Sequence, residues 1–382
     1  MGSPAPTDRP REKATLVIAS SDTDSNLYYA TEYLTSDPYV FLRIAGEAII
    51  LAGELELGRA RKQARVDRVV PTLPYDTRLR EQGIAPRLTD YLDLYLRERG
   101  VEELEVPPSF PVGHAERLRE KGYKLTVGEE PFFPERAVKR PAEIERIVAA
   151  QRAAEEALDR AIDLLARSRI DGETLRLDGD VLTAERVQRE LRMLLLERGY
   201  LAAEVIVAGG EQGCDPHVRG SGPLPPHRTI IIDIFPRSIE SRYWGDLTRT
   251  VVRGRAGEAV KKIYRDVEEA KSLALSLIRD GAEGSAIHQA VVACFQARGN
   301  STGEVNGRMQ GFIHGTGHGV GLDLHEPPRI SKANSTLSAG NVVTVEPGLY
   351  YPGIGAVRLE DLVVVEAAGV RNLTRFPQQL EV

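Results

Sequence analysis

The sequence predicts an α/β protein built from two domains, and three observations lead to that prediction. The chain has 382 residues, whereas a single domain has roughly 100–200. Over its first third, short apolar runs (ATLVIAS, YVFLRI, EAIILAG) alternate with charged amphipathic stretches such as TRLREQGIAPRLTDYLDLYLRERG. A stretch rich in Gly, Pro and aromatic residues, VGEEPFFPER, then interrupts this pattern. We therefore expect a disordered tail at 1–13, a first domain at 14–136 and a second domain at 137–382.

Composition excludes several classes of protein. Apolar residues make up 42% of the chain, which is enough to form a core in each domain. The net charge of -6 gives no overall positive field, so neither nucleic acid nor a membrane surface is an expected partner. The two cysteines are too few for a disulfide framework, and no apolar run reaches the roughly 18 residues of a membrane span. Because the polar N-terminal segment also lacks the apolar stretch of a signal peptide, we expect a cytoplasmic protein.

The second domain is expected to use one order of elements twice, helices followed by strands. Apolar residues at helical spacing, among them Ile147, Ala154 and Leu158, predict a long helix over 141–168. After two helical segments come three strand-like runs, EVIVAGG, TIIIDIF and SRYWGDLTRTVVRG. Two further helical segments, AVKKIYRDVEEAKSLALSLIRDG and AIHQAVVACFQARG, precede the strand-like runs NVVTVEPGLYYPG and AVRLEDLVVVEAAG. This repetition indicates a duplicated architecture.

Asp233 is the first residue that points to chemistry, because it lies inside the apolar run TIIIDIF. A strand there places Ile231 and Phe235 on the same face, so the carboxylate is expected to be buried. Burying an ionised carboxylate costs several kcal/mol, so Asp233 must be paired, protonated or bound to a cation. For one such residue, a structural salt bridge is an open alternative.

Three further carboxylates, Asp246, Glu346 and Glu360, lie in apolar strand-like runs or at their ends. Strand alternation places Thr248 on the same face as Asp246, and Arg358 on the same face as Glu360. If all four carboxylates converge, about four negative charges lie in a medium of low dielectric constant, and two divalent metal ions would balance them. The alternative is that each carboxylate belongs to an ordinary ion pair.

Three of the seven histidines, His314, His318 and His325, fall within the glycine-rich segment HGTGHGVGLDLHEPP. Such a segment is neither a core helix nor a regular strand, and no Gly-Lys-Ser/Thr follows it as in a phosphate-binding loop. His217, in CDPHVRG, lies upstream of the Asp233 run and is a further candidate for the same site. A Cys-His nucleophile that uses Cys214 lacks an orienting third group at recognisable spacing. No GxSxG serine-hydrolase motif is present.

Four segments in order, DIFPRSIESRYWGDLTRT, HGTGHGVGLDLHEPP, TVEPGLYY and RLED, resemble the metal-binding motifs of Xaa-Pro aminopeptidases and prolidases. These enzymes are dinuclear metallopeptidases of the pita-bread fold. Near the N-terminus, SNLYYATEYLTSDPYVFL resembles the opening of the creatinase-type domain that precedes their catalytic domain. The resemblance therefore implies a small creatinase-type α/β domain over 14–136 and a pseudo-symmetric pita-bread catalytic domain over 137–382.

Carried over by motif, the five metal ligands of the family fall on Asp233, Asp246, His318, Glu346 and Glu360. The resemblance implies two divalent metal ions. This oxygen-rich ligand set suits Mn²⁺ and could hold Zn²⁺, Co²⁺ or Fe²⁺. In such enzymes a metal-bridging hydroxide attacks the Xaa-Pro bond at the N-terminus of a peptide or in a dipeptide.

The resemblance also implies roles for the neighbouring residues. Glu346 would accept the proton of the attacking water as well as bind metal. His217 and His325 would bind the substrate and stabilise the intermediate, while His314 and Arg358 would lie behind the metal ligands. The family further implies a homodimer in which the N-terminal domain of one subunit reaches toward the catalytic pocket of the other.

The sequence departs from the family pattern at one place. Asp246 lies 13 residues after Asp233, whereas the family usually has 11. Because two extra residues preserve the side-chain facing of a strand, metal binding remains expected, while the nearby substrate pocket is expected to differ in shape.

Two alternative functions differ from a peptidase in what they require of the ligand positions. A creatinase-like hydrolase of the same fold works without metal and need not keep the five ligands. A non-catalytic peptide- or protein-binding relative should carry substitutions among the ligands or histidines. All five ligand positions hold the required residue type here, so the peptidase is favoured.

Overall fold

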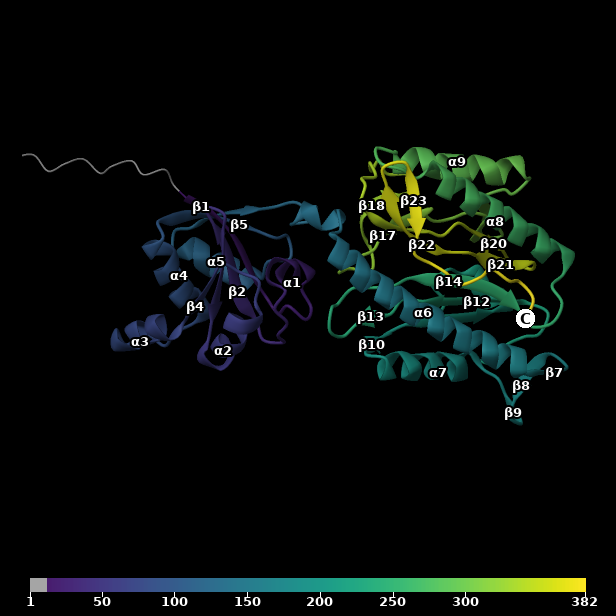
Figure 1. Cartoon of the computed structure of the whole chain (residues 1–382), viewed down its shortest axis with the longest axis horizontal. Helices are drawn as coiled ribbons and strands as arrows, with labels where there is room; N and C mark the ends of the chain where they lie inside the picture. Colours follow the sequence, from purple (N-terminus) through teal and green to yellow (C-terminus); the bar gives the residue numbers. More distant parts are fainter. Residues whose placement is uncertain (1–11) are drawn as a thin grey trace, which may run out of the picture. The chain divides into compact units, whose positions relative to one another are not determined.

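The computed structural model describes residues 12–382, which divide into two compact units (Figure 1). The first unit ends at Pro134, and the second spans Glu135–Val382. The sequence predicts the boundary near Arg136. Residues 1–11 of the expected tail lie outside the described range, whereas Glu12 and Lys13 are the first residues of a strand. No helix within 12–382 is long and apolar enough to cross a membrane.

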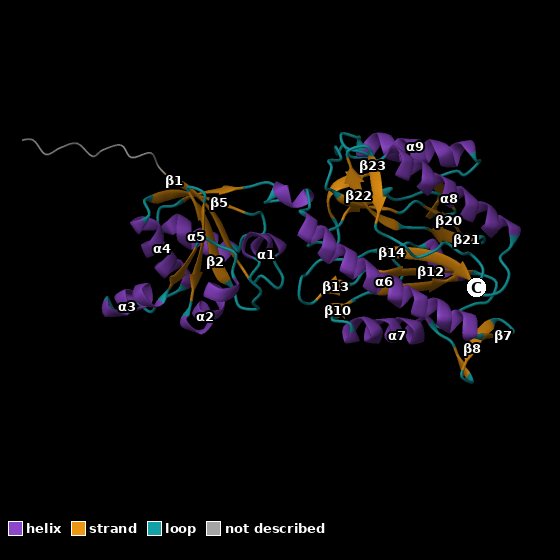
Figure 2. Ribbon diagram, viewed as in Figure 1, coloured by secondary structure: helices purple, strands orange, loops and turns teal. Residues whose placement is uncertain are grey.

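The first unit is a mixed sheet of six strands in the order β4-β3-β2-β1-β5-β6, with helices beside it (Figure 2). Residues of β1 alternate between two apolar clusters, with Leu16 and Ile18 in one cluster and Val17 in the other. Both faces of the sheet are therefore buried, as is typical of an α/β unit. Its elements are β1 (Glu12–Ala19), α1 (Ser25–Thr31), β2 (Tyr39–Ile44), β3 (Glu47–Ala52), α2 (Glu54–Gln63), β4 (Arg68–Pro71), α3 (Leu73–Glu81), α4 (Leu88–Glu98), β5 (Val101–Val106), α5 (Val112–Glu120) and β6 (Lys124–Val127).

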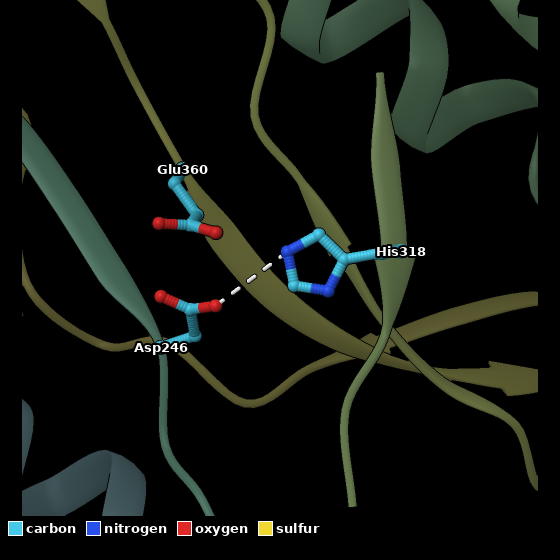
Figure 3. A group of neighbouring side chains, drawn as sticks. All are labelled: Asp246, His318 and Glu360. Atoms are coloured by element: carbon cyan, nitrogen blue, oxygen red, sulfur yellow. Dashed lines mark ion pairs between the residues drawn. The ribbon is translucent and has the colours of Figure 1, made fainter. Parts of the chain in front are cut away.

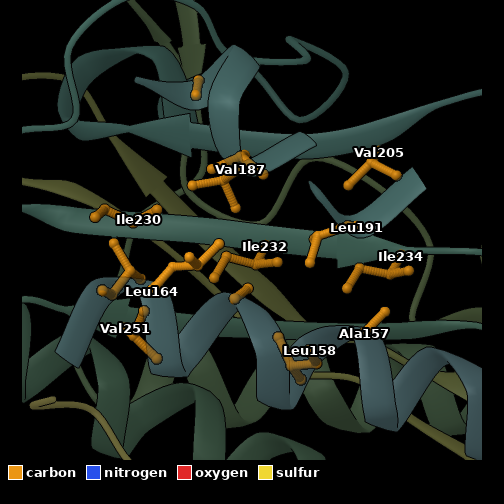
Figure 4. Packing of buried hydrophobic residues seen from close by; sticks show 14 of the residues in the cluster. Ala157, Leu158, Leu164, Val187, Leu191, Val205, Ile230, Ile232, Ile234 and Val251 are labelled. Atoms are coloured by element: carbon orange, nitrogen blue, oxygen red, sulfur yellow. The ribbon is translucent and has the colours of Figure 1, made fainter. Parts of the chain in front are cut away.

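The first half of the second unit packs two helices, α6 (Pro141–Arg167) and α7 (Ala184–Glu197), against a three-stranded antiparallel sheet. The sheet has the order β11-β12-β14, formed by Val205–Gly209, Thr229–Ile234 and Leu247–Val252. Alternate residues of β12, from Ile230 to Ile234, point toward the helices and form the core with them (Figure 4). The opposite face of β12 carries Asp233.

The second half repeats this order. Helices α8 (Glu258–Leu277) and α9 (Gly284–Ala297) pack against a five-stranded sheet in the order β18-β17-β19-β22-β23. Its strands are β17 (Gly317–Gly319), β18 (Glu326–Ile330), β19 (Val342–Val345), β22 (Asp361–Glu366) and β23 (Gly369–Asn372). Two helices followed by a sheet therefore occur twice, as the sequence pattern indicates.

One predicted strand is interrupted. The run 356–369 was expected to be strand-like throughout, but β21 (Gly355–Arg358) ends before Glu360 and β22 begins at Asp361. The reason is that β21 pairs with β20 (Gly348–Tyr351) in a hairpin, whereas β22 pairs with β19 in the larger sheet. The short remaining elements are η1 (Pro134–Ala137), β7 (Arg169–Asp171), β8 (Thr174–Leu177), β9 (Asp180–Val181), β10 (Tyr200–Leu201), η2 (Gly210–Cys214), β13 (Arg237–Ser238), β15 (Gly303–Val305) and β16 (Arg308–Gln310).

Candidate active site

A cavity of about 570 Å³ opens in the second unit. The side chains that line it come from both halves of that unit and include nearly all residues singled out from the sequence. The residues singled out from the sequence that line the cavity are Asp233, Asp246, His318, Glu346, Glu360, His217, His314, His325 and Arg358. Thr248, the remaining candidate, does not line the cavity but donates a hydrogen bond to Glu360 Oε2 at 2.8 Å.

The first two carboxylates reach the cavity from neighbouring antiparallel strands. Asp233 lies on β12 directly opposite Thr248 on β14. Asp246 comes immediately before β14, two residues from Thr248, so strand alternation turns it to the same side. The backbone N–H of Asp246 donates to Gln151 Oε1 at 2.9 Å, which fixes the start of the strand.

The second half supplies the other ligand candidates. His318 is the central residue of β17, and a Cβ atom on the preceding Gly317 would lie 1.9 Å from the Thr344 carbonyl oxygen. Glycine is thus required for β17 to approach the strand that ends before Glu346. Glu360 enters from the break between β21 and β22.

His318 lies among carboxylates in a form suited to metal binding. Its Nε2 is 3.7 Å from Asp246 Oδ2 and 3.4 Å from Glu346 Oε1. Atoms of Asp246, His318 and Glu360 all lie within 4.8 Å of one another (Figure 3). Since Nδ1 is 3.1 Å from the Gly319 carbonyl oxygen, the proton is assigned to Nδ1 and the Nε2 lone pair faces the carboxylates. Burial lowers the pKa of His318 to about 4, so the imidazole is neutral at pH 7.

The carboxylates repel one another in this buried setting. Burial, followed by the charges of neighbouring carboxylates, raises the pKa of both Asp246 and Glu360 well above its usual range. Burial also raises the pKa of Glu346 to about 7, although Arg358 opposes the shift. Asp233 accepts a hydrogen bond from Arg358 Nη2 at 2.6 Å through Oδ2, but its buried Oδ1 has no hydrogen-bond partner within residues 12–382. Such a cluster has a strong preference for protons or metal cations.

A hydrogen-bonded chain lies behind the carboxylates. Arg358 Nη1 donates to Tyr350 Oη at 2.9 Å, and Arg358 Nε donates to Thr248 Oγ1 at 3.3 Å. Tyr350 Oη is 2.8 Å from His314 Nε2, and His314 Nδ1 is 2.8 Å from the Gly315 carbonyl oxygen. Because that carbonyl can only accept, His314 carries its proton on Nδ1 and accepts from Tyr350 at Nε2. The chain fixes the guanidinium against Asp233.

Two histidines remain available to a bound molecule. Neither His217 nor His325 forms a side-chain hydrogen bond within the described residues, although both line the cavity. The His325 ring contacts the His318 ring edge-on, with centroids 4.4 Å apart. Although His325 is exposed at the cavity, the desolvation of its ring there lowers its pKa to about 4, which keeps the imidazole neutral. By contrast, burial raises the pKa of the Cys214 thiol to about 11, which disfavours the Cys-His alternative.

Sequence reasoning missed several residues of the site, among them Arg329, Tyr350 and Gln151. Arg329 lines the cavity, and its guanidinium forms no hydrogen bond or ion pair within residues 12–382. Tyr350 belongs to the chain behind the carboxylates, and Gln151 is a fully buried amide on the apolar face of α6. The signal for Gln151 was present, since it is a polar residue next to Ala150 and Ala154 on that apolar face.

Comparisons with known proteins show the family to which the chain belongs. The model of metallopeptidase family M24 matches residues 145–367. The chain is 28% identical over 319 residues to a Xaa-Pro dipeptidase of Pyrococcus horikoshii, covering 81% of this chain and 84% of the relative. A Xaa-Pro dipeptidase of Pyrococcus furiosus is 28% identical over 316 residues, covering 81% and 85% respectively.

Solved structures match almost the entire chain. The prolidase from Pyrococcus horikoshii superposes with a TM-score of 0.76 and 25% identity, covering 97% of this chain and 95% of that one. An X-Pro aminopeptidase from Thermotoga maritima has a TM-score of 0.81 at 22% identity, covering 97% and 98%. These matches confirm the predicted fold class, a pita-bread domain preceded by an N-terminal α/β domain. Because the family model spans more than half of the chain, this protein belongs to metallopeptidase family M24.

Proposed function

We propose that this protein is a two-metal peptidase that hydrolyses the Xaa-Pro bond at the N-terminus of peptides or in dipeptides. The observation that carries the proposal is the charge of the cavity. Besides Glu204, which pairs with Arg219, four carboxylates and a neutral histidine converge there. Two arginines, Arg329 and Arg358, also line the cavity, and within the described residues only Arg358 is bonded to any of the four carboxylates. The proposed metal ligands are Asp233, Asp246, His318, Glu346 and Glu360.

The donor set fits divalent metal ions. A lone pair of His318 directed at carboxylate oxygens is repulsive unless a proton or a metal cation lies between them, and the unpartnered Oδ1 of Asp233 offers a further ligand atom. One imidazole and four carboxylates form a hard ligand set, so we propose Mn²⁺. When bound, a pair of such ions polarises the scissile carbonyl and lowers the pKa of a water molecule.

The chain's own residues supply the proton transfer and the binding contacts. Glu346 lines the cavity with Oε1 3.4 Å from His318 Nε2, where it is suited to take a proton from water and return it to the leaving amine. His217 and His325, both free of internal hydrogen bonds, can donate to the oxygen of the substrate carbonyl. Arg358 and Thr248 hold Asp233 and Glu360 in place.

Proline selectivity is supported by the similarity of the chain to two Xaa-Pro dipeptidases and by chemistry. The amide of an Xaa-Pro bond has no N–H, so a peptidase that binds its substrate through that N–H binds this bond poorly. Polarisation of the carbonyl requires no N–H. The unpaired Arg329 at the cavity also provides a counter-charge for a free carboxylate, which favours dipeptides.

Paired substrates test this specificity. We expect kcat/KM for Ala-Pro-Ala to exceed that for Ala-Ala-Ala. We also expect kcat/KM for Ala-Pro to exceed that for Ala-Pro-amide, because only the acid carries a negative charge that can pair with Arg329. Arg329→Gln should remove the second preference and leave the first. Equal values for Ala-Pro-Ala and Ala-Ala-Ala would reject proline selectivity while leaving the metallopeptidase assignment intact.

We further propose a homodimer in the cytoplasm. Light scattering should give a mass of about twice the 42.0 kDa of one chain. A mass of one chain at micromolar concentration contradicts the dimer.

A further inference from the structure

Four charged side chains meet beside His325, and we refer to them as the Glu326 cluster: Arg136, Lys139, Asp323 and Glu326. Glu326 is 6% exposed, and its carboxylate accepts hydrogen bonds from Lys139 Nζ at 2.5 Å and Arg136 Nη2 at 3.1 Å. Arg136 Nη2 also donates to Asp323 Oδ2 at 2.7 Å. Two positive and two negative charges are thereby balanced, so this cluster, unlike the cavity, needs no further cation.

The Glu326 cluster fixes the backbone of the loop 321–326. The backbone N–H of Asp323 donates to Glu326 Oε2 at 3.3 Å. A Cβ atom on Gly321 would lie 2.5 Å from Glu326 Oε1, so the loop packs directly on the carboxylate. Trp244 Nε1 also donates to the Leu322 carbonyl oxygen at 3.0 Å.

The segment that carries the two cations is itself anchored. The backbone N–H of Lys139 donates to the Gly340 carbonyl oxygen at 2.8 Å, and Asn341 Nδ2 donates to the Ala137 carbonyl oxygen at 2.8 Å. Gly340 and Asn341 come directly before β19, the strand that leads to Glu346. The Glu326 cluster therefore links the His325 loop to the strand of a proposed metal ligand.

His325 depends on this loop for its position. Its imidazole forms no hydrogen bond within the described residues, and its ring contact with His318 is edge-on at 4.4 Å. His325 is followed immediately by Glu326, so its backbone is held both by the contacts of the Glu326 carboxylate and by the pairing of Glu326 on β18 with Gly319 on β17.

We propose that Arg136 and Lys139 are positioning residues that act through Glu326 to hold His325 at the cavity. The inference rests on the proposed function, in which His325 contacts the substrate. Loss of the cluster would displace the imidazole without removing a metal ligand. A displacement of about 1 Å can lower a rate by up to about 100-fold.

A double-mutant cycle between Glu326 and His325 tests the proposal. Glu326→Gln should lower kcat by about tenfold to 100-fold, with the Mn²⁺ content and the KM for Ala-Pro unchanged. In the His325→Ala background the same change should cause no further loss, because the group that Glu326 positions is already absent. An equal loss in both backgrounds, or no loss in either, overturns the proposal.

Asp266→Asn is the matched control. Asp266 is another buried carboxylate, bonded to Lys262 Nζ at 2.7 Å and Arg298 Nε at 2.7 Å, but it does not line the cavity. This variant should lower Tm and leave kcat unchanged. If Glu326→Gln does not fold, Lys139→Met, which keeps the Arg136 bond, takes its place in the cycle.

The cycle also separates this proposal from the proposed function. If His325→Ala alone retains full activity, the role assigned to His325 in catalysis is wrong. If His325→Ala loses activity while Glu326→Gln and Lys139→Met do not, only the positioning role is wrong.

Discussion

Glu360 and Asp361 are consecutive in the sequence and equally well buried, at 2% and 5% exposed, yet their surroundings are opposite. Glu360 faces the other cavity carboxylates, and burial together with their charges raises its pKa. Asp361 accepts hydrogen bonds from Lys271 Nζ at 2.6 Å and Arg249 Nη2 at 2.9 Å. Burial would raise the pKa of Asp361, but these two cations outweigh burial and lower it.

The contrast shows what distinguishes a structural carboxylate from a proposed metal ligand in this molecule. Burial does not distinguish them, because both carboxylates have lost their contact with water. The balance of charge distinguishes them, since Asp361 forms ion pairs with Lys271 and Arg249, whereas Glu360 forms none within the described residues. A buried cluster left with excess negative charge is destabilising on its own and is retained where a cation or proton completes it.

The largest expected difference concerns catalysis. Glu346→Gln should lower kcat by about 10²–10⁴-fold, because it removes an anionic ligand and the proposed proton acceptor from the unbalanced cluster. The fold should persist, because the substitution relieves repulsion among carboxylates. Turnover of the purified, metal-loaded variant on Ala-Pro measures this effect. Unchanged turnover would mean that the site is misassigned.

The next difference concerns stability. Asp361→Asn should lower the free energy of unfolding by about 3–5 kcal/mol, because it leaves Lys271 and Arg249 buried without their anion. In metal-free protein, Asp246→Asn should cause no such loss. Urea denaturation of both chelator-treated variants makes the comparison. If Asp246→Asn destabilises the metal-free protein as much as Asp361→Asn, charge balance is not what separates the two clusters.

The smallest expected difference is in pH dependence. The pKa of Glu346 is about 7 in the folded protein and about 4.3 in an unfolded chain, so the folded state binds more protons between these values. The unfolding free energy of metal-free protein should therefore fall as pH rises from about 5 to 8, and the fall should be smaller in Glu346→Gln. Asp361, with a lowered pKa, should instead lose its stabilising effect as pH falls below about 4. Parallel curves for wild type and Glu346→Gln contradict the first expectation.

The sequence was informative where the chemical type of a residue differed from that of its neighbours. Asp233 inside an isoleucine run and three histidines within a glycine-rich segment are local anomalies, and the structure brings these residues to one cavity. Arg329 gave no such signal, because an arginine after two prolines is ordinary in a surface strand. Nor could the sequence separate Glu360 from Asp361, since the nearest partner of Asp361, Lys271, lies on α8. Pairing across distant elements is a property of the packed fold.

The two halves of the catalytic unit illustrate the same limit. Periodicity indicated a helices-then-strands order twice, but the strand predicted through Glu360 is broken where the chain passes from one sheet to another. Apolar alternation continues across that break, so the pattern alone could not reveal it.

Metal titration of chelator-treated protein tests the central claim most directly, namely that the excess negative charge of the cavity is a two-metal site. We expect each chain to bind two Mn²⁺ ions, with hydrolysis of Ala-Pro recovering in step with binding, and Asp246→Asn to bind fewer. Full activity in protein that contains no metal and takes up none would contradict the claim.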